Sequence, residues 1–159
     1  MAMGRFGPAE RQIRAAFNDS EGTGALARSA VVQCRLYRGD PRGAIEALDE
    51  AKDFLDPFEA ELTRTYILVQ LTDAIMVPKG MARRLLDQRD EGLLGYMGAV
   101  VLLLGVGRHD VAAPRLRGSV ESCEANRSEW GVTLRWEIAK AKELLRTAGR
   151  RGRQWPSPP

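Results

Sequence analysis

Apolar residues recur every three or four positions along most of the chain, and glycine, proline and aspartate residues divide this pattern into segments about one helix long. This spacing is typical of an amphipathic helix, whereas a half-buried strand would alternate at every second position. We therefore expect an all-α protein of about eight helices. The predicted helices cover residues 8–17, 25–38, 41–55, 58 to about 74, 78 to at least 86, 92 to about 105, a segment from 112 or 113 onward, and 126–149.

Prolines and caps set several of these limits. A proline is tolerated in the first turn of a helix but costs about 3 kcal/mol in its interior. The helix that contains Pro114 is therefore expected to begin at Ala112 or Ala113. Asn126, with a glutamate three residues later, resembles a capping box, and Gly149 suits the C-terminal cap of the last helix.

The last predicted helix has two apolar faces. The first stripe consists of Trp130, Leu134, Ile138, Ala141 and Leu145. Val132, Trp136 and Ala139 lie about 180 degrees from that stripe at 100 degrees per residue. If the first face packs on the other helices, the second is either covered by the N-terminal segment or another subunit, or forms a partner surface centred on Trp136.

The turn at Gly39 and Asp40 carries a repeat pattern. Second helices of successive hairpins are expected at residue 41, at residue 78 and near residue 110, with spacings of 37 and 32 residues. Gly107 follows Gly39 by 68 residues, and Ala112 stands at the offset from Gly107 that Ala44 has from Gly39. Small residues at this offset let two antiparallel helices cross closely.

This pattern over about residues 25–125 resembles the tetratricopeptide-repeat family, whose unit is 34 residues long. The resemblance implies stacked antiparallel hairpins whose first helices form a groove for a peptide or protein. Three departures are Arg28 at the position of the family's first-helix aromatic residue, Pro78 in place of the middle Gly-Asp turn, and Pro114 in the third unit. A non-repetitive helical bundle with hairpins of similar length would give the same spacings, so both arrangements stay open.

Charge separates the end of the chain from its body. The formal net charge is +3, and the segment from Arg146 onward contains four arginines and no acidic residue, so the remainder is about neutral. We expect one helical domain over residues 1–149 and a flexible basic, proline-rich tail over residues 150–159.

Residue types that carry catalysis or bind metals are sparse. His109 is the single histidine, and Cys34 and Cys123 form no CxxC pair or cluster with histidine, which argues against a metal site or a thiol enzyme. Gly105 and Gly107 suggest a phosphate loop, but Asp110 stands where its third glycine would be. We expect no cofactor, no metal and no enzymatic activity.

Two further patterns bear on location. The uncharged run over residues 92–107 is shorter than the roughly 20 apolar residues that span a bilayer, so a helix buried on nearly all sides is expected there. The first residues lack the apolar core of a secretory signal. We expect a cytoplasmic protein without a membrane span.

The leading hypothesis is a noncatalytic adaptor, a protein–protein interaction scaffold that binds a protein or peptide. The candidate partner-binding residues are Arg28, Arg35, Thr65, Gln70 and Tyr96 on the first helices, together with Trp136 for a second contact that includes homo-oligomer formation. The alternative is a nucleic-acid-associated helical protein of a phage-packaging or regulatory type. Its candidate residues are Arg150, Arg151, Arg153 and Trp155 in the basic tail.

Overall fold

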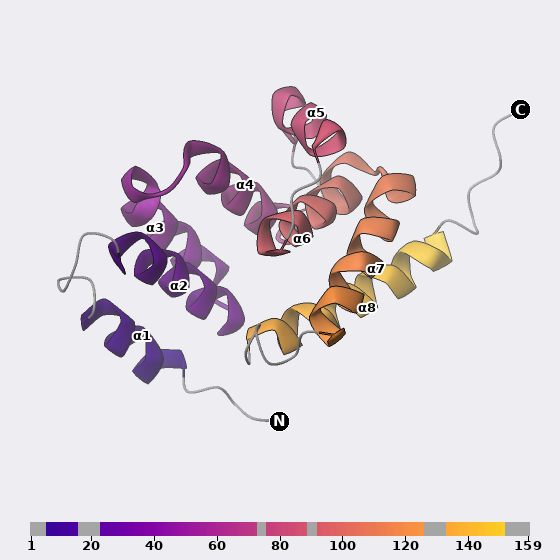
Figure 1. The fold of residues 1–159 in the computed structure, drawn as a ribbon. Coiled ribbons are helices and arrows are strands. Elements are labelled where there is room, and N and C mark those ends of the chain that lie inside the picture. The colour runs from indigo at the N-terminus through magenta and orange to yellow at the C-terminus, as the bar shows by residue number, and fades with distance from the viewer. Residues whose placement is uncertain (1–5, 16–22, 73–75, 89–91, 126–132, 152–159) are drawn as a thin grey trace, which may run out of the picture. The chain divides into compact units, whose positions relative to one another are not determined.

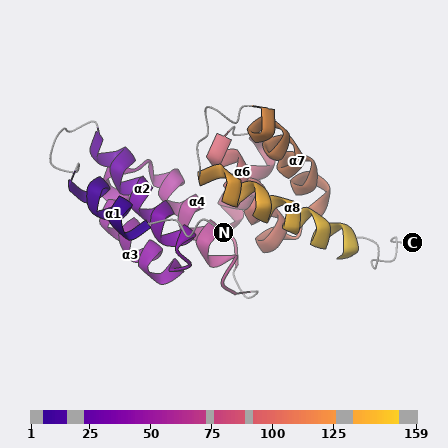
Figure 2. The same ribbon diagram turned by 90° about the horizontal axis from the view of Figure 1, so that it is seen from below.

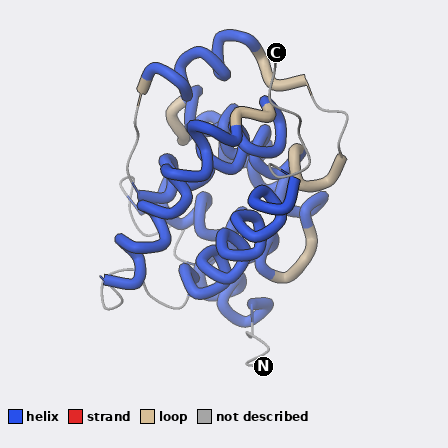
Figure 3. The backbone as a smooth tube through the Cα atoms, turned by 90° about the vertical axis from the view of Figure 1, so that its right-hand side faces the viewer, coloured by secondary structure: helices blue, strands red, loops and turns tan. Residues whose placement is uncertain are grey.

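The computed structural model describes residues 6–15, 23–72, 76–88, 92–125 and 133–151. All of the regular elements in these ranges are helices, as Figure 3 shows, so the predicted all-α class is confirmed. The chain divides into two compact units, Met1–Leu71 and Thr72–Pro159. The boundary falls between the fourth and fifth helices, which the repeat interpretation assigned to one middle hairpin.

Unit 1 contains four α-helices and one short 3-10 helix. They are α1 (Phe6–Ala15), α2 (Thr23–Tyr37), α3 (Pro41–Ala51), η2 (Lys52–Phe54) and α4 (Pro57–Leu68). Figures 1 and 2 show α2 beside α3 and α1 beside α2, in agreement with the contacts between these helices. The core of this unit is apolar and formed mainly by Val31, Val32, Ala44, Leu48, Ala51, Leu62, Tyr66 and Ile67.

A glycine makes the turn between α2 and α3. Gly39 has a φ of 77°, in the left-handed region that favours glycine, and its N–H donates to the Leu36 carbonyl at 3.0 Å. Asp40 then caps α3, because its side chain accepts a hydrogen bond of 2.9 Å from the N–H of Gly43. Pro41 occupies the first position of the helix, where its missing N–H removes no helical hydrogen bond.

Unit 2 contains the remaining elements. They are α5 (Lys79–Asp87), α6 (Gly92–Val101), the π-helix η3 (Leu102–Val106), α7 (His109–Ala125) and α8 (Thr133–Arg151). The helices α6 and α7 form a second hairpin, and α8 packs on α7. The predicted burial holds for the middle of the apolar run, because every residue from 96 to 103 is buried, whereas Leu104 is 40% exposed. Among the described helices, none is long and apolar enough to cross a membrane.

Arg115 of α7 fastens the end of α5. Its guanidinium donates to the carbonyl oxygens of Leu85, of Leu86 at 3.1 Å and of Gln88 at 3.4 Å. The last carbonyl groups of a helix have no partner within the helix, so an arginine from a neighbouring helix satisfies them here. The side chain of Leu85 is itself 2% exposed, which places this contact at the edge of the unit 2 core.

The two hairpins share one local geometry. Gly107 has a φ of 75°, close to that of Gly39, and in both hairpins the second helix begins two residues after the glycine. Ala44 and Ala112, five residues after their glycines, are both 0% exposed. A leucine four residues further along is also fully buried in each hairpin, at positions 48 and 116. The same sequence signal thus gives a left-handed glycine and a buried alanine at the same offset twice. The hydrogen bonds of the two turns differ, because the Asp40 N–H donates to the Arg35 carbonyl, whereas the Arg108 N–H donates to the Leu102 carbonyl of the π-helix η3.

Two predicted helix limits are wrong. The helix α7 begins at His109, which places Pro114 inside it. The proline lacks an N–H for the Asp110 carbonyl, but this carbonyl lies in the first turn, and burial of the flanking Ala112 and Leu116 offsets the loss. The expected C-terminal cap at Gly149 is also absent, since α8 continues to Arg151, and arginines in a last turn interact favourably with the helix dipole.

The end of α4 differs most from the prediction. The helix α4 ends at Leu68 rather than near residue 74, because the chain passes into tight turns in which Gln70 and Leu71 donate to the carbonyls three residues before them. The capping box expected at Asn126 lies outside the described residues, and α8 is described from Thr133 onward.

Candidate functional site

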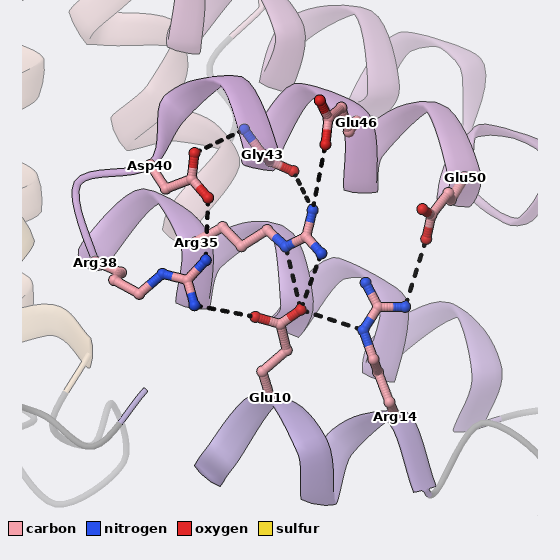
Figure 4. Close-up of polar contacts among 8 residues, drawn as sticks. All are labelled: Glu10, Arg14, Arg35, Arg38, Asp40, Gly43, Glu46 and Glu50. Atoms are coloured by element: carbon pink, nitrogen blue, oxygen red, sulfur yellow. Dashed lines mark hydrogen bonds and ion pairs between the residues drawn. The ribbon is translucent and has the colours of Figure 1, made fainter. Parts of the chain in front are cut away.

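The most elaborate polar cluster in the described part of the chain surrounds Glu10 in unit 1 (Figure 4). The Glu10 side chain is 12% exposed, and its Oε1 atom accepts hydrogen bonds of 3.1 Å from Arg14 of the same helix and from Arg35 of α2. Arg38, which directly follows α2, lies 3.8 Å from the other carboxylate oxygen. Three guanidinium groups therefore surround one carboxylate.

Arg35 and Arg38 each have a second anchor on α3 or its cap. Arg35 donates through Nη1 to the Gly43 carbonyl at 2.7 Å, and the same atom lies 3.9 Å from Glu46. Arg38 donates through Nη2 to Asp40 at 3.0 Å. Because these anchors do not involve α1, they fix the two guanidinium groups from the side opposite Glu10, as Figure 4 shows.

The contact between α1 and α3 adds one more ion pair. Arg14 Nη1 lies 3.5 Å from Glu50 Oε2 on α3. Thus Glu10 and Arg14, one helical turn apart on α1, interact with opposite charges on two different helices. In the order of the sequence, the acidic Glu10 precedes the basic Arg14 on α1.

The electrostatics of the cluster favour ionised carboxylates. Burial raises the pKa of Glu10, but the hydrogen bonds from Arg35 and Arg14 and the charges of both arginines more than compensate, and the pKa lies below 4.5. The hydrogen bond from the Gly43 N–H, followed by that from Arg38, lowers the pKa of Asp40. Burial, and then the Glu10 charge, raise the pKa of the neighbouring Cys34 thiol.

This arrangement recognises a carboxylate. Arginine forms directional, charge-assisted hydrogen bonds with carboxylate oxygens, and these are stronger than hydrogen bonds between neutral groups. A general base or a nucleophile would need a group that gives up or takes a proton near neutral pH. The guanidinium groups stay charged, and a thiol whose pKa is raised is largely protonated there.

The structure places the predicted partner residues in different surroundings. Arg35 belongs to the Glu10 cluster. Arg28, also on α2, lies with its guanidinium carbon 4.1 Å from the centre of the Phe54 ring. Thr65 is 6% exposed, and its hydroxyl donates to the Glu61 carbonyl of its own helix at 2.9 Å. Whether any of these three residues contacts a partner stays a prediction.

The other predicted residues lie further along the chain. Gln70, just after α4, donates to the Tyr66 carbonyl at 2.7 Å. Tyr96 of α6 is 5% exposed in the core of unit 2. Trp136 lies on α8, and its side chain is outside the described part of the structure. On α8, Ala141 of the first apolar stripe is buried, whereas Ala139 of the second is exposed.

The tail residues are described only in part. Arg150 and Arg151 belong to the last turn of α8, although their side chains are outside the described part. Arg153 and Trp155 lie beyond the described residues altogether. His109, expected as an exposed polar residue at a turn, is exposed at the start of α7 beside an ion pair of 2.7 Å between Arg108 and Asp110.

Sequence reasoning missed the role of Glu10, Arg14 and Arg38. A signal for the first two was available, because an acidic and a basic residue four positions apart indicate a helix pair. The spacing of three residues between Arg35 and Arg38 would place them on one face of a helix, although α2 itself ends at Tyr37. That the two faces meet depends on the packing of α1 on α2, which no local pattern specifies.

No group of three or more histidine, cysteine, aspartate or glutamate side chains with metal-binding geometry occurs among the described residues. No protein-family model matches the chain, and no curated protein and no solved structure matches it.

Proposed function

We propose that the protein is a noncatalytic helical scaffold of the cytoplasm that binds a protein or peptide partner through tetratricopeptide-like hairpins. The observation that carries the proposal is the shared geometry of the hairpins α2–α3 and α6–α7. Each combines a left-handed glycine, a helix start two residues later and a fully buried alanine five residues later. Proteins built from such repeated hairpins use the surfaces of stacked helices to bind partners.

The chemistry of the reactive side chains supports a noncatalytic role. Cys34 has a raised pKa in the vicinity of Glu10, whereas a catalytic thiol requires a lowered one. Asp110, beside His109, is held by Arg108, whose hydrogen bond lowers the pKa of that carboxyl to about 2. This aspartate therefore forms an ion pair with an arginine and does not orient the histidine as a general base.

The predicted partner surface is tested best at residues that the fold does not need in its core. Arg28 and Gln70 are half-exposed, and Trp136 is the candidate for a second contact or for self-association. Substituting the buried Thr65 or Tyr96 would change packing as well as any contact. Exposed Arg117 of α7 offers a matched control, because it carries the same charge and lies outside the predicted groove.

The experiment uses the purified full chain as bait for affinity capture, followed by calorimetric titration of the captured protein. We expect a saturable complex of defined stoichiometry that is weakened by Arg28→Ala, Gln70→Ala or Trp136→Ala and unchanged by Arg117→Ala. A purified chain that forms no saturable complex with any captured protein overturns the proposal. Equal affinities for all four variants would remove these residues from the partner surface.

The second candidate function is nucleic-acid binding by the basic tail. It is favoured by the continuation of α8 to Arg151, which makes two of the tail arginines part of a folded helix. Replacing Arg150, Arg151 and Arg153 by glutamine and measuring retention of DNA and RNA at two salt concentrations separates the candidates. Phosphate-driven binding falls with both changes, whereas a protein complex formed by the hairpins retains its affinity.

A further inference from the structure

The contacts described for α1 with the rest of its unit include ion pairs formed by Glu10 and Arg14. None of the described residues from Gly7 to Ala15 is buried, and the apolar Ala9 and Ile13 are half-buried. By contrast, α2 and α3 bury Val31, Val32 and Leu48 almost completely. Ion pairs are weakened by salt and by loss of ionisation, so α1 is the element of unit 1 that leaves most easily.

The anchors of the two arginines beneath α1 do not involve α1. Arg35 donates to the Gly43 carbonyl at 2.7 Å, and Arg38 donates to Asp40 at 3.0 Å. Both anchors lie at the N-terminus of α3, which is itself fixed by the cap at Asp40. Departure of Glu10 would therefore leave two oriented guanidinium groups with an empty position for a carboxylate, which is a preorganised binding site.

We propose that α1 is a displaceable internal ligand and that the surface beneath it, formed by Arg35, Arg38 and Glu50, binds a partner helix with a glutamate followed four residues later by an arginine. The inference rests on the proposed scaffold function and names the partner's chemistry. In the closed state, Glu10 contacts both arginines and Arg14 lies 3.5 Å from Glu50. A partner with the same pair in the same direction makes the same contacts.

Charge complementarity at both ends of the surface selects this partner. An acidic helix without the arginine would leave Glu50 facing a like charge, and a basic helix would face Arg35 and Arg38 with its own cations. The spacing of four residues matches one helical turn, so both partner side chains reach the surface from a single face. The partner helix must also compete with α1 for this surface. Because α1 belongs to the same chain, it acts as a tethered ligand with a high effective concentration.

The direct experiment measures binding of a fluorescent peptide, residues 4–17 of this chain, to the full-length protein by anisotropy. Wild-type protein, Glu10→Gln and the control Arg11→Gln, at an exposed position on the same helix, are compared. The Glu10→Gln protein is expected to bind the peptide at least about tenfold more tightly than the wild type does, because its own α1 competes less. The control is expected to resemble the wild type.

A second peptide, in which the glutamate corresponding to Glu10 is glutamine, provides the specificity arm. It is expected to bind the Glu10→Gln protein about tenfold more weakly than the first peptide does. Equal binding of both peptides, or no binding of either to the Glu10→Gln protein, overturns the inference. Far-UV circular dichroism checks that the variant keeps the helical content of the wild type.

Hydrogen exchange of the unsubstituted protein supplies a test that does not depend on a variant. Amides of α1 are expected to exchange several-fold faster at about 500 mM than at about 50 mM NaCl, while those of α2 and α3 keep their protection. Equal salt dependence of all three helices contradicts a separately displaceable α1. If the peptide arms fail while a captured protein still forms a saturable complex, the inference falls and the proposed function stands.

Discussion

Glu10 and Arg35 are joined through a single carboxylate oxygen, which lies 3.1 Å from both Nε and Nη2 of the arginine. This contact connects α1 to α2, and α1 has no buried residue among those described. The position of the first helix therefore depends on the ionisation of one carboxyl group more than on its apolar face.

The first prediction concerns the pH dependence of α1. Because the pKa of Glu10 is lowered in the folded protein, its contribution to stability is complete above the unfolded value of about 4.5 and is lost as the pH falls through the folded pKa. We expect protection of α1 amides to fall as the pH drops below about 4.5, and Glu10→Gln to lower this protection by about 1 to 2 kcal/mol at neutral pH.

Hydrogen exchange by mass spectrometry, compared between wild type and variant, isolates this group from other carboxyls that titrate in the same range. Asp40, whose pKa is also lowered, is present in both proteins and cancels in the difference. Identical pH profiles for α1 in the two proteins would show that Glu10 does not hold this helix.

The second prediction concerns the alanines at the hairpin crossings. Ala44 and Ala112 are 0% exposed, so a larger side chain at either position forces the paired helices apart. Ala44→Leu and Ala112→Leu are each expected to lower the free energy of unfolding by about 1 to 3 kcal/mol in urea denaturation. Ala139→Leu, at an exposed position of α8, is the control, and a comparable loss there would remove the special role of the crossing.

The third prediction separates backbone strain from packing. A Cβ atom added at Gly39 or Gly107 meets nothing within 4 Å, so any loss comes from the positive φ alone. Each alanine substitution is expected to cost about 1 to 2 kcal/mol. Gly118→Ala within α7, where the added atom also has open space, should stabilise by about 0.5 to 1 kcal/mol. Thermal unfolding measures whether each substitution raises or lowers the stability. A change in the same direction at all three positions would be inconsistent with the left-handed turns.

The fourth prediction concerns Arg115 and the end of α5. Arg115→Ala removes the donor to the carbonyls of Leu85, Leu86 and Gln88, and is expected to reduce protection of α5 amides by about 1.5 to 3 kcal/mol. Arg117→Ala, two positions along α7 and exposed, removes the same charge without this contact. Equal effects of the two substitutions on α5 would assign the change to net charge instead.

The sequence predicted the helices and the two glycine turns well, because their signals are local. Apolar periodicity marks a helix wherever its packing partner lies, and a glycine followed by a helix start is a turn signal in itself. The error at Pro114 has the opposite origin. The cost of a proline inside a helix can be predicted from the sequence. The burial of Ala112 and Leu116 that offsets this cost depends on tertiary packing.

The candidate site was only partly predictable for the same reason. Arg35 was chosen as a polar residue on a first helix, yet its partners Glu10 and Gly43 lie on two other helices. Charged residues on an amphipathic helix are usually exposed to solvent, so the spacing of Glu10 and Arg14 indicated a helix pair but not that Glu10 would be more covered than the exposed Glu46. The resemblance to tetratricopeptide repeats stays a prediction, supported by the matching turns at Gly39 and Gly107.

Quantitative affinity capture with the full chain, with and without nuclease, tests the scaffold function most directly. If the protein binds partners through its hairpins, the same proteins will be captured in both samples. Each will then form a saturable complex with the purified chain. Loss of all captured protein after nuclease treatment would contradict the account and favour nucleic-acid binding by the basic tail.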